Sequence, residues 1–142
     1  MRIAMMTHTF YPNFIGGREK HIYSISKLLI NLGYDVCVFT GDRVKHIIFD
    51  RYDGIPVVRA PMLTVNLPGR EKIPYRLVAP SLIYALKRFN PDLIHAHDYR
   101  HSTTDLAALY AKYQHLPLII TVHGFFYTPI MLTKALMRIY DL

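Results

Sequence analysis

The sequence predicts an α/β protein with an open, mostly parallel, doubly wound sheet and helices on both faces. Segments with the apolar character of short strands alternate along the chain with segments of helical periodicity. The first strand, helix and second strand follow one another as a unit that predicts parallel pairing. A chain of 142 residues, 51% of them hydrophobic, can bury one sizeable core. We therefore expect residues 1–142 to form a single domain.

The first third of the chain predicts a strand, a helix and a second strand. Residues 2–6 are a short apolar run, and a loop ending in two glycines follows them. From Arg18 onward, apolar residues recur at helical spacing until Gly33, which provides a helix stop. Residues 36–40 are rich in Val and Phe and predict the next strand. The helical stripe expected to face the core consists of Ile22, Ile25, Leu28, Leu29 and Leu32.

The middle of the chain predicts a hairpin followed by a loop. Asp53 and Gly54 stand between two short apolar runs, residues 47–49 and 55–58, which is typical of a tight turn between paired strands. Residues 61–74 are predicted to form a loop. The remaining pattern predicts helices over 75–89 (its opening turns interrupted by Pro80), 103–114 and 130–140, and strands over 93–97 and 118–122.

Composition and charge limit the function classes. The formal net charge of +7 indicates an anionic partner, but the basic residues are scattered, so we expect no nucleic-acid interface. No apolar run approaches the roughly 18 residues of a membrane span, and the first residues lack a signal-peptide pattern. Cys37 is the only cysteine, which excludes an internal disulfide and a cysteine-based zinc site. We expect a cytoplasmic location, with peripheral contact at the inner membrane face as an open alternative.

Glycines and polar residues follow three predicted strands at the edge where open α/β sheets bind ligands. Gly16 and Gly17 precede a helix, where positive φ angles would turn amides toward an anion such as phosphate. An ordinary turn stays open as an alternative, because neither a dinucleotide fingerprint nor a P-loop is present. Glu19, in the first helical turn, is expected to favour the helix dipole. The other two features at this edge are His97-Asp98 and His123-Gly124.

Two interpretations apply to the histidines near residue 97. His95 and His97 alternate onto the same face of a strand, as metal ligands would, and Asp98 and His101 follow closely. The H-x-H-x-D-H pattern of metal-dependent hydrolases is incomplete, however, because Arg100 occupies a position where that pattern requires a metal ligand. The alternative is that His95 is a core histidine and Asp98 caps the following turn or helix, which leaves His97 as the functional member.

His123 follows the last predicted strand and precedes a glycine. At the mouth of the crevice its imidazole could donate a hydrogen bond to a sugar hydroxyl or a phosphate without changing its protonation state. An ordinary histidine at a strand end is the alternative.

Taken together, four motifs in order resemble one family, the family 4 retaining glycosyltransferases with the GT-B fold. The resemblance extends over essentially the whole chain and corresponds to the amino-terminal half of that fold. The motifs are Thr9-Phe10-Tyr11-Pro12 with Gly16-Gly17-Arg18-Glu19-Lys20-His21-Ile22, then residues 32–40 (LGYDVCVFT), residues 91–97 (PDLIHAH) and residues 121–124 (TVHG).

The resemblance implies two Rossmann-like domains that face each other, with the acceptor bound mainly by the first and the nucleotide sugar mainly by the second. By position, Gly16 and Gly17 resemble the loop whose amides reach the donor diphosphate. His123 resembles the catalytic histidine facing the donor sugar. The acceptor-side candidates are Tyr11, His97 and Asp98. The resemblance implies a nucleoside-diphosphate sugar as donor substrate, and neither a cofactor nor a metal is expected.

One departure from the family concerns activity. The carboxyl-terminal Glu-x7-Glu signature is missing, since the chain has only Glu19 and Glu71. We therefore expect a truncated enzyme that lacks its nucleotide-sugar domain and is inactive alone. Its partner would be that domain or a separate chain. Two alternatives are a non-catalytic binding or membrane-anchoring module that works with a catalytic partner, and a metal-dependent hydrolase using His95, His97 and Asp98.

Overall fold

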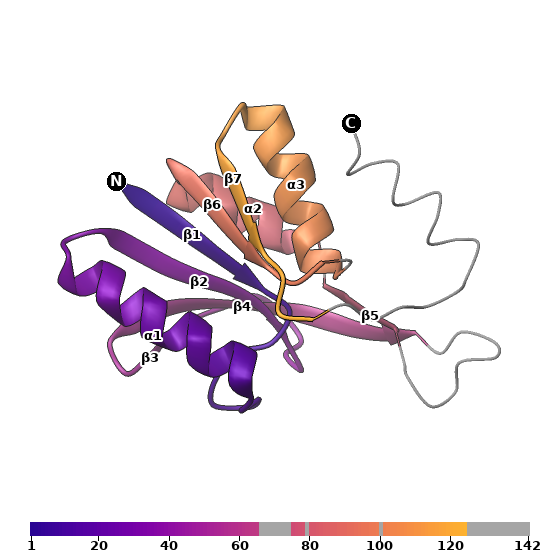
Figure 1. Ribbon diagram of the computed structural model, residues 1–142. Coiled ribbons are helices and arrows are strands. Elements are labelled where there is room, and N and C mark those ends of the chain that lie inside the picture. Colours follow the sequence, from indigo (N-terminus) through magenta and orange to yellow (C-terminus); the bar gives the residue numbers. More distant parts are fainter. Residues whose placement is uncertain (66–74, 79, 100, 125–142) are drawn as a thin grey trace.

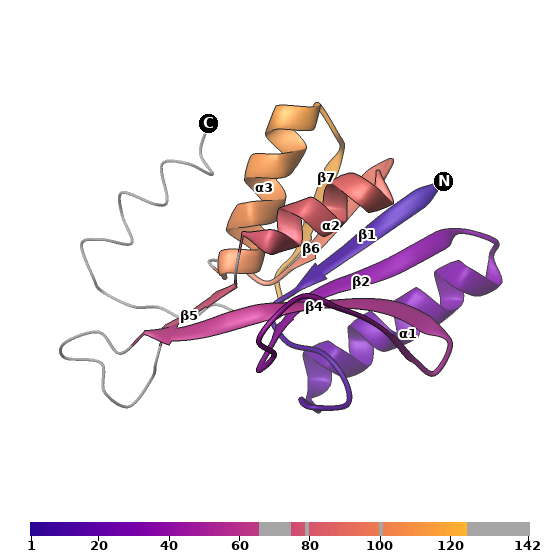
Figure 2. The same cartoon turned by 180° about the vertical axis from the view of Figure 1, so that it is seen from behind.

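The computed structural model describes residues 1–65, 75–78, 80–99 and 101–124. The strands form one sheet, and helices cover its two faces (Figures 1 and 2). The strands are β1 (Arg2–Thr7), β2 (Asp35–Asp42), β3 (Ile48–Tyr52), β4 (Ile55–Val65), β5 (Tyr75–Val78), β6 (Leu93–His97) and β7 (Leu118–Thr121). The helices are α1 (Gly17–Asn31), α2 (Ser81–Phe89) and α3 (Ser102–Gln114). The helix predicted over residues 130–140 lies outside the described residues. None of the described helices has the length and apolar character needed to cross a membrane.

The sheet has the doubly wound order that alternation of strands and helices predicts. Its strands are arranged β3-β4-β2-β1-β6-β7, and β5 pairs with the distal part of β4. β1, β2, β4, β6 and β7 run parallel, and only β3 and β5 pair antiparallel with β4. The order reverses between β1 and β6, because the chain builds outward from β1 first on one side and then on the other. The predicted fold class is confirmed, and a crevice is expected beyond this reversal point.

Alternating side chains of the central strands fill two cores, one on each face of the sheet. Ile3 and Met5 of β1 point toward the face that α1 covers, where Ile22 is fully buried. Ala4 and Met6 point toward the opposite face, which α2 and α3 cover (Figures 1 and 2). Because both faces are covered, these strands are apolar on both sides, as parallel sheets require.

Helix α1 forms as predicted, but fewer of its apolar residues are buried than predicted. The helix ends in two backbone hydrogen bonds, from Tyr34 N to Leu29 O (3.0 Å) and from Gly33 N to Ile30 O (2.9 Å). This ending requires the positive φ of 84° at Gly33. The prediction that Leu28 and Leu32 face the core is wrong, since their exposed fractions are 57% and 65%.

The predicted hairpin is present, whereas the next two elements differ from the prediction. Asp53 and Gly54, with φ of 45° and 80°, form the turn between β3 and β4. β4 then continues to Val65 through part of the predicted loop. Residues 75–78 form β5 and not the start of a helix, because Pro80 stands as N-cap of α2 and these residues instead pair with β4.

A buried arginine ties the edge of the sheet to the loop after β1. Arg59 of β4 is 4% exposed, and its Nη1 lies 3.1 Å from Asp42 Oδ2 at the end of β2. Its Nε lies 3.0 Å from Asp50 Oδ2 on β3, and its Nη2 donates to the Tyr11 carbonyl over 2.6 Å. One guanidinium thus fixes three segments with charge-assisted hydrogen bonds.

Replacing Arg59 is expected to destabilise the domain strongly. The change Arg59→Met leaves the buried Asp42 carboxylate without its cation, so the free energy of unfolding should fall by about 3–5 kcal/mol. Urea denaturation followed by circular dichroism measures this loss. Lys45→Met, at an exposed position, serves as the control and should shift stability by no more than about 0.5 kcal/mol. Equal stability of the two variants would contradict the role given to Arg59.

Candidate functional site

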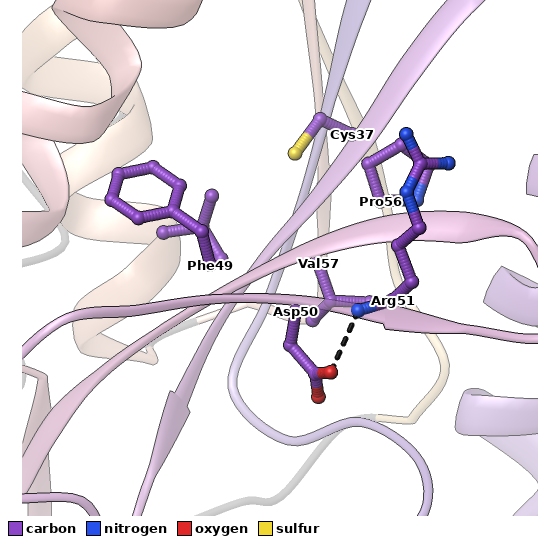
Figure 3. A pocket seen from close by; sticks show the side chains of 7 residues that line it. Cys37, Phe49, Asp50, Arg51, Pro56 and Val57 are labelled. Carbon is purple, nitrogen blue, oxygen red and sulfur yellow. Dashed lines mark hydrogen bonds between the residues drawn. The ribbon is translucent and has the colours of Figure 1, made fainter.

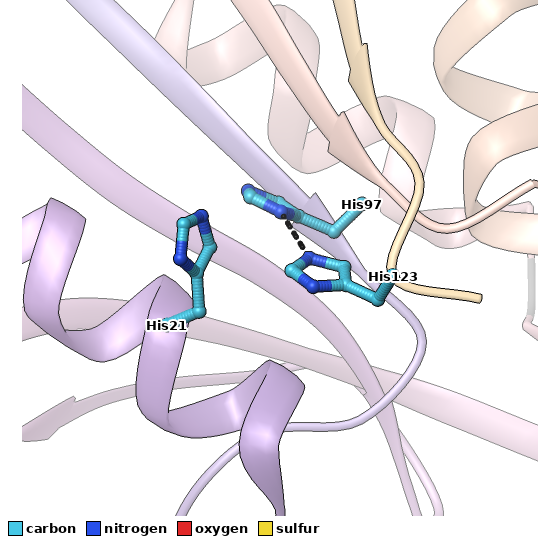
Figure 4. A group of neighbouring side chains, drawn as sticks. All are labelled: His21, His97 and His123. Atoms are coloured by element: carbon cyan, nitrogen blue, oxygen red, sulfur yellow. Dashed lines mark hydrogen bonds between the residues drawn. The ribbon is translucent and has the colours of Figure 1, made fainter.

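Three histidines meet where the strand order reverses (Figure 4). His21 comes from α1, His97 ends β6, and His123 follows β7. One imidazole nitrogen from each lies within 4.8 Å of the others. His97 is fully buried, whereas His21 and His123 are exposed. The cluster therefore has one fixed member in the sheet and two members that solvent and ligands can reach.

The buried member is held neutral by its surroundings. His97 Nδ1 and His123 Nε2 are 3.1 Å apart and share a hydrogen bond, with the two rings stacked at 5.4 Å between centroids. Burial, together with the neighbouring imidazoles, lowers the pKa of His97 to about 2. Burial also lowers the pKa of His123. Both rings are therefore uncharged at neutral pH and can act as hydrogen-bond donors and acceptors.

The other predicted histidines have separate surroundings. His95 Nε2 lies 2.8 Å from Thr121 Oγ1, which links β6 to β7, and its ring is 4.3 Å from that of His97. His95 thus shares a face with His97, as alternation predicts, and fits the alternative of a core histidine. The His101 ring instead stacks on His8 at 4.5 Å between centroids. Among the described residues, the histidine cluster is formed with His21 and not with His95 or His101.

A network of charges joins the start of α1 to the end of β6. Arg18 contacts the carboxylates of both Glu19 and Asp98, and it also contacts Thr9 Oγ1. Thr9 Oγ1 in turn donates to Glu19 Oε1 over 2.7 Å. Glu19 is 5% exposed, and hydrogen bonds from Thr9 and Arg18 lower its pKa despite the opposing effect of burial. Its role extends beyond the predicted interaction with the helix dipole.

Asp98 does not cap the following helix. Its backbone takes the left-handed conformation, with φ of 73°, and its amide donates to Thr121 O over 2.9 Å. The carboxylate faces Arg18, whereas α3 begins after His101 without a side-chain cap. The interpretation of Asp98 as the cap of that helix is therefore wrong. The turn after β6 directs this carboxylate toward α1 instead.

The two glycines lie at the start of α1, but not in the predicted conformation. Gly16 is extended, with φ of −154°, and neither glycine has a positive φ. A Cβ on Gly16 would approach Glu19 Oε2 to 2.8 Å, whereas a Cβ on Gly17 would meet nothing within 4 Å. The helix begins without a side-chain cap, and the Glu19 carboxylate accepts a hydrogen bond from its own amide, so the amides of Gly17 and Arg18 are the ones without an intrahelical partner. Gly17 and His21 are one turn apart and therefore share a face of α1.

Tyr11 lies in an aromatic cluster rather than in the histidine cluster. Its ring stacks on Tyr52 at 5.1 Å between centroids and meets Tyr23 edge-on at 5.8 Å. These tyrosines line a surface pocket of about 430 Å³ together with Lys20 and Ser24. Of the predicted acceptor-side residues, His97 and Asp98 thus lie at the end of β6, and Tyr11 lies beside the hairpin of β3 and β4.

A second pocket, of about 480 Å³, lies over β2, β3 and β4 (Figure 3). It includes Cys37, Phe49 and Arg51, whose backbone amide donates to Asp50 Oδ1 over 2.7 Å. Burial raises the pKa of the Cys37 thiol to about 12, so the nucleophilic thiolate is absent at neutral pH. The chemistry-bearing groups gather at the histidine cluster and not in this pocket.

The sequence interpretation gave no site role to His21 or Arg18, although both stand in the quoted glycine motif. The signal for His21 was helical spacing. His21 follows Gly17 by four residues, which places it on the face that looks toward a ligand at the helix start. Arg18 could be recognised only after β6 was placed beside β1, because its partner Asp98 is 80 residues away.

Comparisons with known proteins agree with this architecture. The family model described as Glycosyltransferase Family 4 matches residues 15–141. The chain is 32% identical over 96 residues to a GDP-mannose-dependent alpha-mannosyltransferase from Corynebacterium glutamicum, a match covering 67% of this chain and 22% of that protein. It is also 32% identical over 129 residues to a subunit of the human phosphatidylinositol N-acetylglucosaminyltransferase, covering 87% of this chain and 25% of that protein. The chain thus matches about a quarter of the length of these relatives.

A solved structure shows the same fold. The crystal structure of MurG from Acinetobacter baumannii superposes with a TM-score of 0.52 at 17% identity, over 97% of this chain and 39% of that one. The fold is that of a Rossmann-like domain of GT-B glycosyltransferases. Since the family model covers most of the sequence, the chain belongs to glycosyltransferase family 4.

Proposed function

We propose that this chain is the amino-terminal, acceptor-side domain of a retaining glycosyltransferase. The enzyme would transfer a sugar from a nucleoside-diphosphate sugar to an acceptor, and a second domain or partner chain would supply the nucleotide site. One observation carries the proposal: the uncapped, glycine-containing start of α1 and the imidazoles of His21, His97 and His123 meet where the strand order reverses. Open α/β sheets bind their ligands at such a point.

The donor diphosphate is assigned to the start of α1. In the transfer step the bond between the sugar and the diphosphate breaks, and negative charge develops on the leaving phosphate oxygen. The amides of Gly17 and Arg18 at the positive end of the helix would stabilise that charge. The absence of a side chain at Gly17 lets a phosphate approach them. Preorganised amides serve this purpose without a metal ion.

The donor sugar is assigned to His123. Its Nε2 is engaged by His97, which orients the exposed ring and leaves Nδ1 for a sugar hydroxyl. The acceptor hydroxyl would attack the anomeric carbon from the face that the diphosphate leaves and pass its proton to the leaving phosphate oxygen, so the configuration is retained. Asp98 and His97 border the acceptor side in this proposal.

Names of the relatives suggest which donors to test first. One relative is GDP-mannose-dependent, and the other belongs to a phosphatidylinositol N-acetylglucosaminyltransferase. We infer that the donor is a nucleoside-diphosphate hexose or N-acetylhexosamine. Because the second relative is named as one subunit of its enzyme, we infer that a partner chain is an alternative source of the nucleotide site.

A membrane-anchoring role is the second candidate, because two apolar side chains near the distal end of β4 and β5 are exposed. Leu63 of β4 and Leu77 of β5 are cross-strand partners with exposed fractions of 64% and 39%. The paired end of β4 and β5 projects beyond the helices (Figures 1 and 2). Together with the net charge of +7, this pair would suit an anionic membrane surface.

His123 provides the direct test of the transferase role. With the chain joined to its nucleotide-binding domain, His123→Asn should lower kcat by about 100-fold or more, because a preorganised donor at the reaction centre is lost. Transfer from GDP-mannose and from nucleoside-diphosphate N-acetylglucosamine is measured by chromatography of labelled product. His46→Asn, at an exposed histidine on the loop before β3, is the control and should retain activity. Equal activity of the two variants would exclude His123 from the reaction.

Arg18 is expected to position the two loops that border the crevice. Arg18→Lys keeps a cation between Glu19 and Asp98 but cannot reproduce the forked contacts of a guanidinium. The rate of transfer should fall roughly 10- to 100-fold, because small misplacements of reacting groups lower rates by that much. The thermal midpoint should change little. Kinetics and a melting curve on the same preparation give both values. Unchanged kinetics, or a loss of activity that matches the unfolded fraction, would contradict the positioning role.

The membrane role predicts a specific effect at the tip of the sheet. In a sedimentation assay, anionic vesicles should bind more of the parent chain than neutral vesicles do. The double change of Leu63 and Leu77 to Glu should weaken binding about tenfold or more, since each leucine contributes roughly 1.5–3 kcal/mol on burial. The matched control changes Leu28 and Leu32 to Glu on the exposed face of α1. Equal loss in both pairs would indicate charge alone and reject the anchoring role.

A further inference from the structure

His21, His97 and His123 have the composition and spacing of a metal site. Three imidazole nitrogens lie within 4.8 Å of one another, one from each of three segments. Neutral histidine is the commonest metal ligand in proteins, and three histidines hold zinc in some catalytic sites. The metal cluster considered from the sequence, around His95 and Asp98, involves only His97 of this set.

The buried ring of His97 has unused hydrogen-bonding capacity. Its Nε2 has no hydrogen-bond partner among the described residues, although the side chain is fully buried. Its Nδ1 shares a single hydrogen bond with His123. Buried polar groups without a partner are rare and often indicate a missing ion or water. An ion between the rings would accept a lone pair from each imidazole at once.

The geometry can close around an ion with side-chain movement alone. Zinc–nitrogen bonds of about 2.0–2.1 Å place tetrahedral ligand atoms roughly 3.3–3.4 Å apart. The observed spread of 4.8 Å must therefore contract by about an ångström and a half. His21 and His123 are exposed and can rotate, whereas His97 is held in the core beside His95. The exposed side also provides the path by which an ion enters.

We propose that His21, His97 and His123 form a binding site for one divalent transition-metal ion of the zinc class. His97 is the anchor, the two exposed histidines close over the ion, and the remaining coordination position faces the crevice. Imidazole ligands select zinc, cobalt, nickel or copper, and magnesium and calcium prefer oxygen ligands. Binding itself is independent of the proposed transfer reaction. Inhibition of transfer, which follows because the ion would engage His123, rests on that proposed function.

The test uses cobalt as a coloured substitute for zinc. The 142-residue chain, freed of metal by a chelator, is titrated with Co²⁺ and followed by visible absorption. We expect saturation at one equivalent, displacement by Zn²⁺ and no displacement by Mg²⁺. His21→Asn and His123→Asn should each weaken Co²⁺ binding roughly 10- to 100-fold or more, since even the loss of a group behind a ligand costs that much. His46→Asn, at an exposed histidine outside the cluster, should bind like the parent chain.

Two results would overturn the metal site. One is the absence of saturable Co²⁺ absorption, and the other is equal affinity of the parent, His21→Asn and His123→Asn chains. Circular dichroism of each variant checks that the fold is intact after each change. If Co²⁺ binds as expected but Zn²⁺ does not inhibit transfer by the chain joined to its nucleotide-binding domain, the metal site stands and the proposed role of His123 fails.

Discussion

Parallel pairing of β1 with β2 on one side and β6 on the other is the constraint on which the remaining structure depends. It requires the chain to cross one face of the sheet through α1 and the opposite face through α2, so both faces of β1 are buried. It also brings the ends of β1 and β6 together at the reversal of strand order. The loop into α1, the turn at Asp98 and the residues after β7 meet there for that reason.

Buried charges then fix the loops that the sheet brings together. Arg18 neutralises Glu19 and Asp98 on one side of the β1 loop, and Arg59 neutralises Asp42 on the other. Each arginine connects segments far apart in sequence, and removing it would leave a buried carboxylate without its cation. The imidazoles of His97 and His123 are neutral, because burial opposes a positive charge on both.

Local patterns predicted the elements that local forces determine. Short apolar segments identified β1, β2, β6 and β7, and Gly33 and the Asp53-Gly54 pair predicted their turns because each position needs a positive φ. β5 was missed because residues 75–78 form a strand only by pairing with the distal part of β4. The periodicity of the sequence carries no information on that pairing. The sequence placed His97, Asp98, Gly16, Gly17 and His123 at strand or helix ends. It did not reveal His21 or Arg18, whose partners are distant in sequence.

The donor is proposed to bind at the start of α1, beside His21, His97 and His123. The most direct measurement is a crystal structure of the chain joined to the nucleotide-binding domain proposed above, with a nucleoside-diphosphate sugar bound. We expect a diphosphate oxygen within hydrogen-bond distance, about 2.7–3.2 Å, of the Gly17 or Arg18 amide, and a sugar hydroxyl equally close to His123. A donor bound at the tyrosine pocket, or with its diphosphate away from α1, would contradict this proposal.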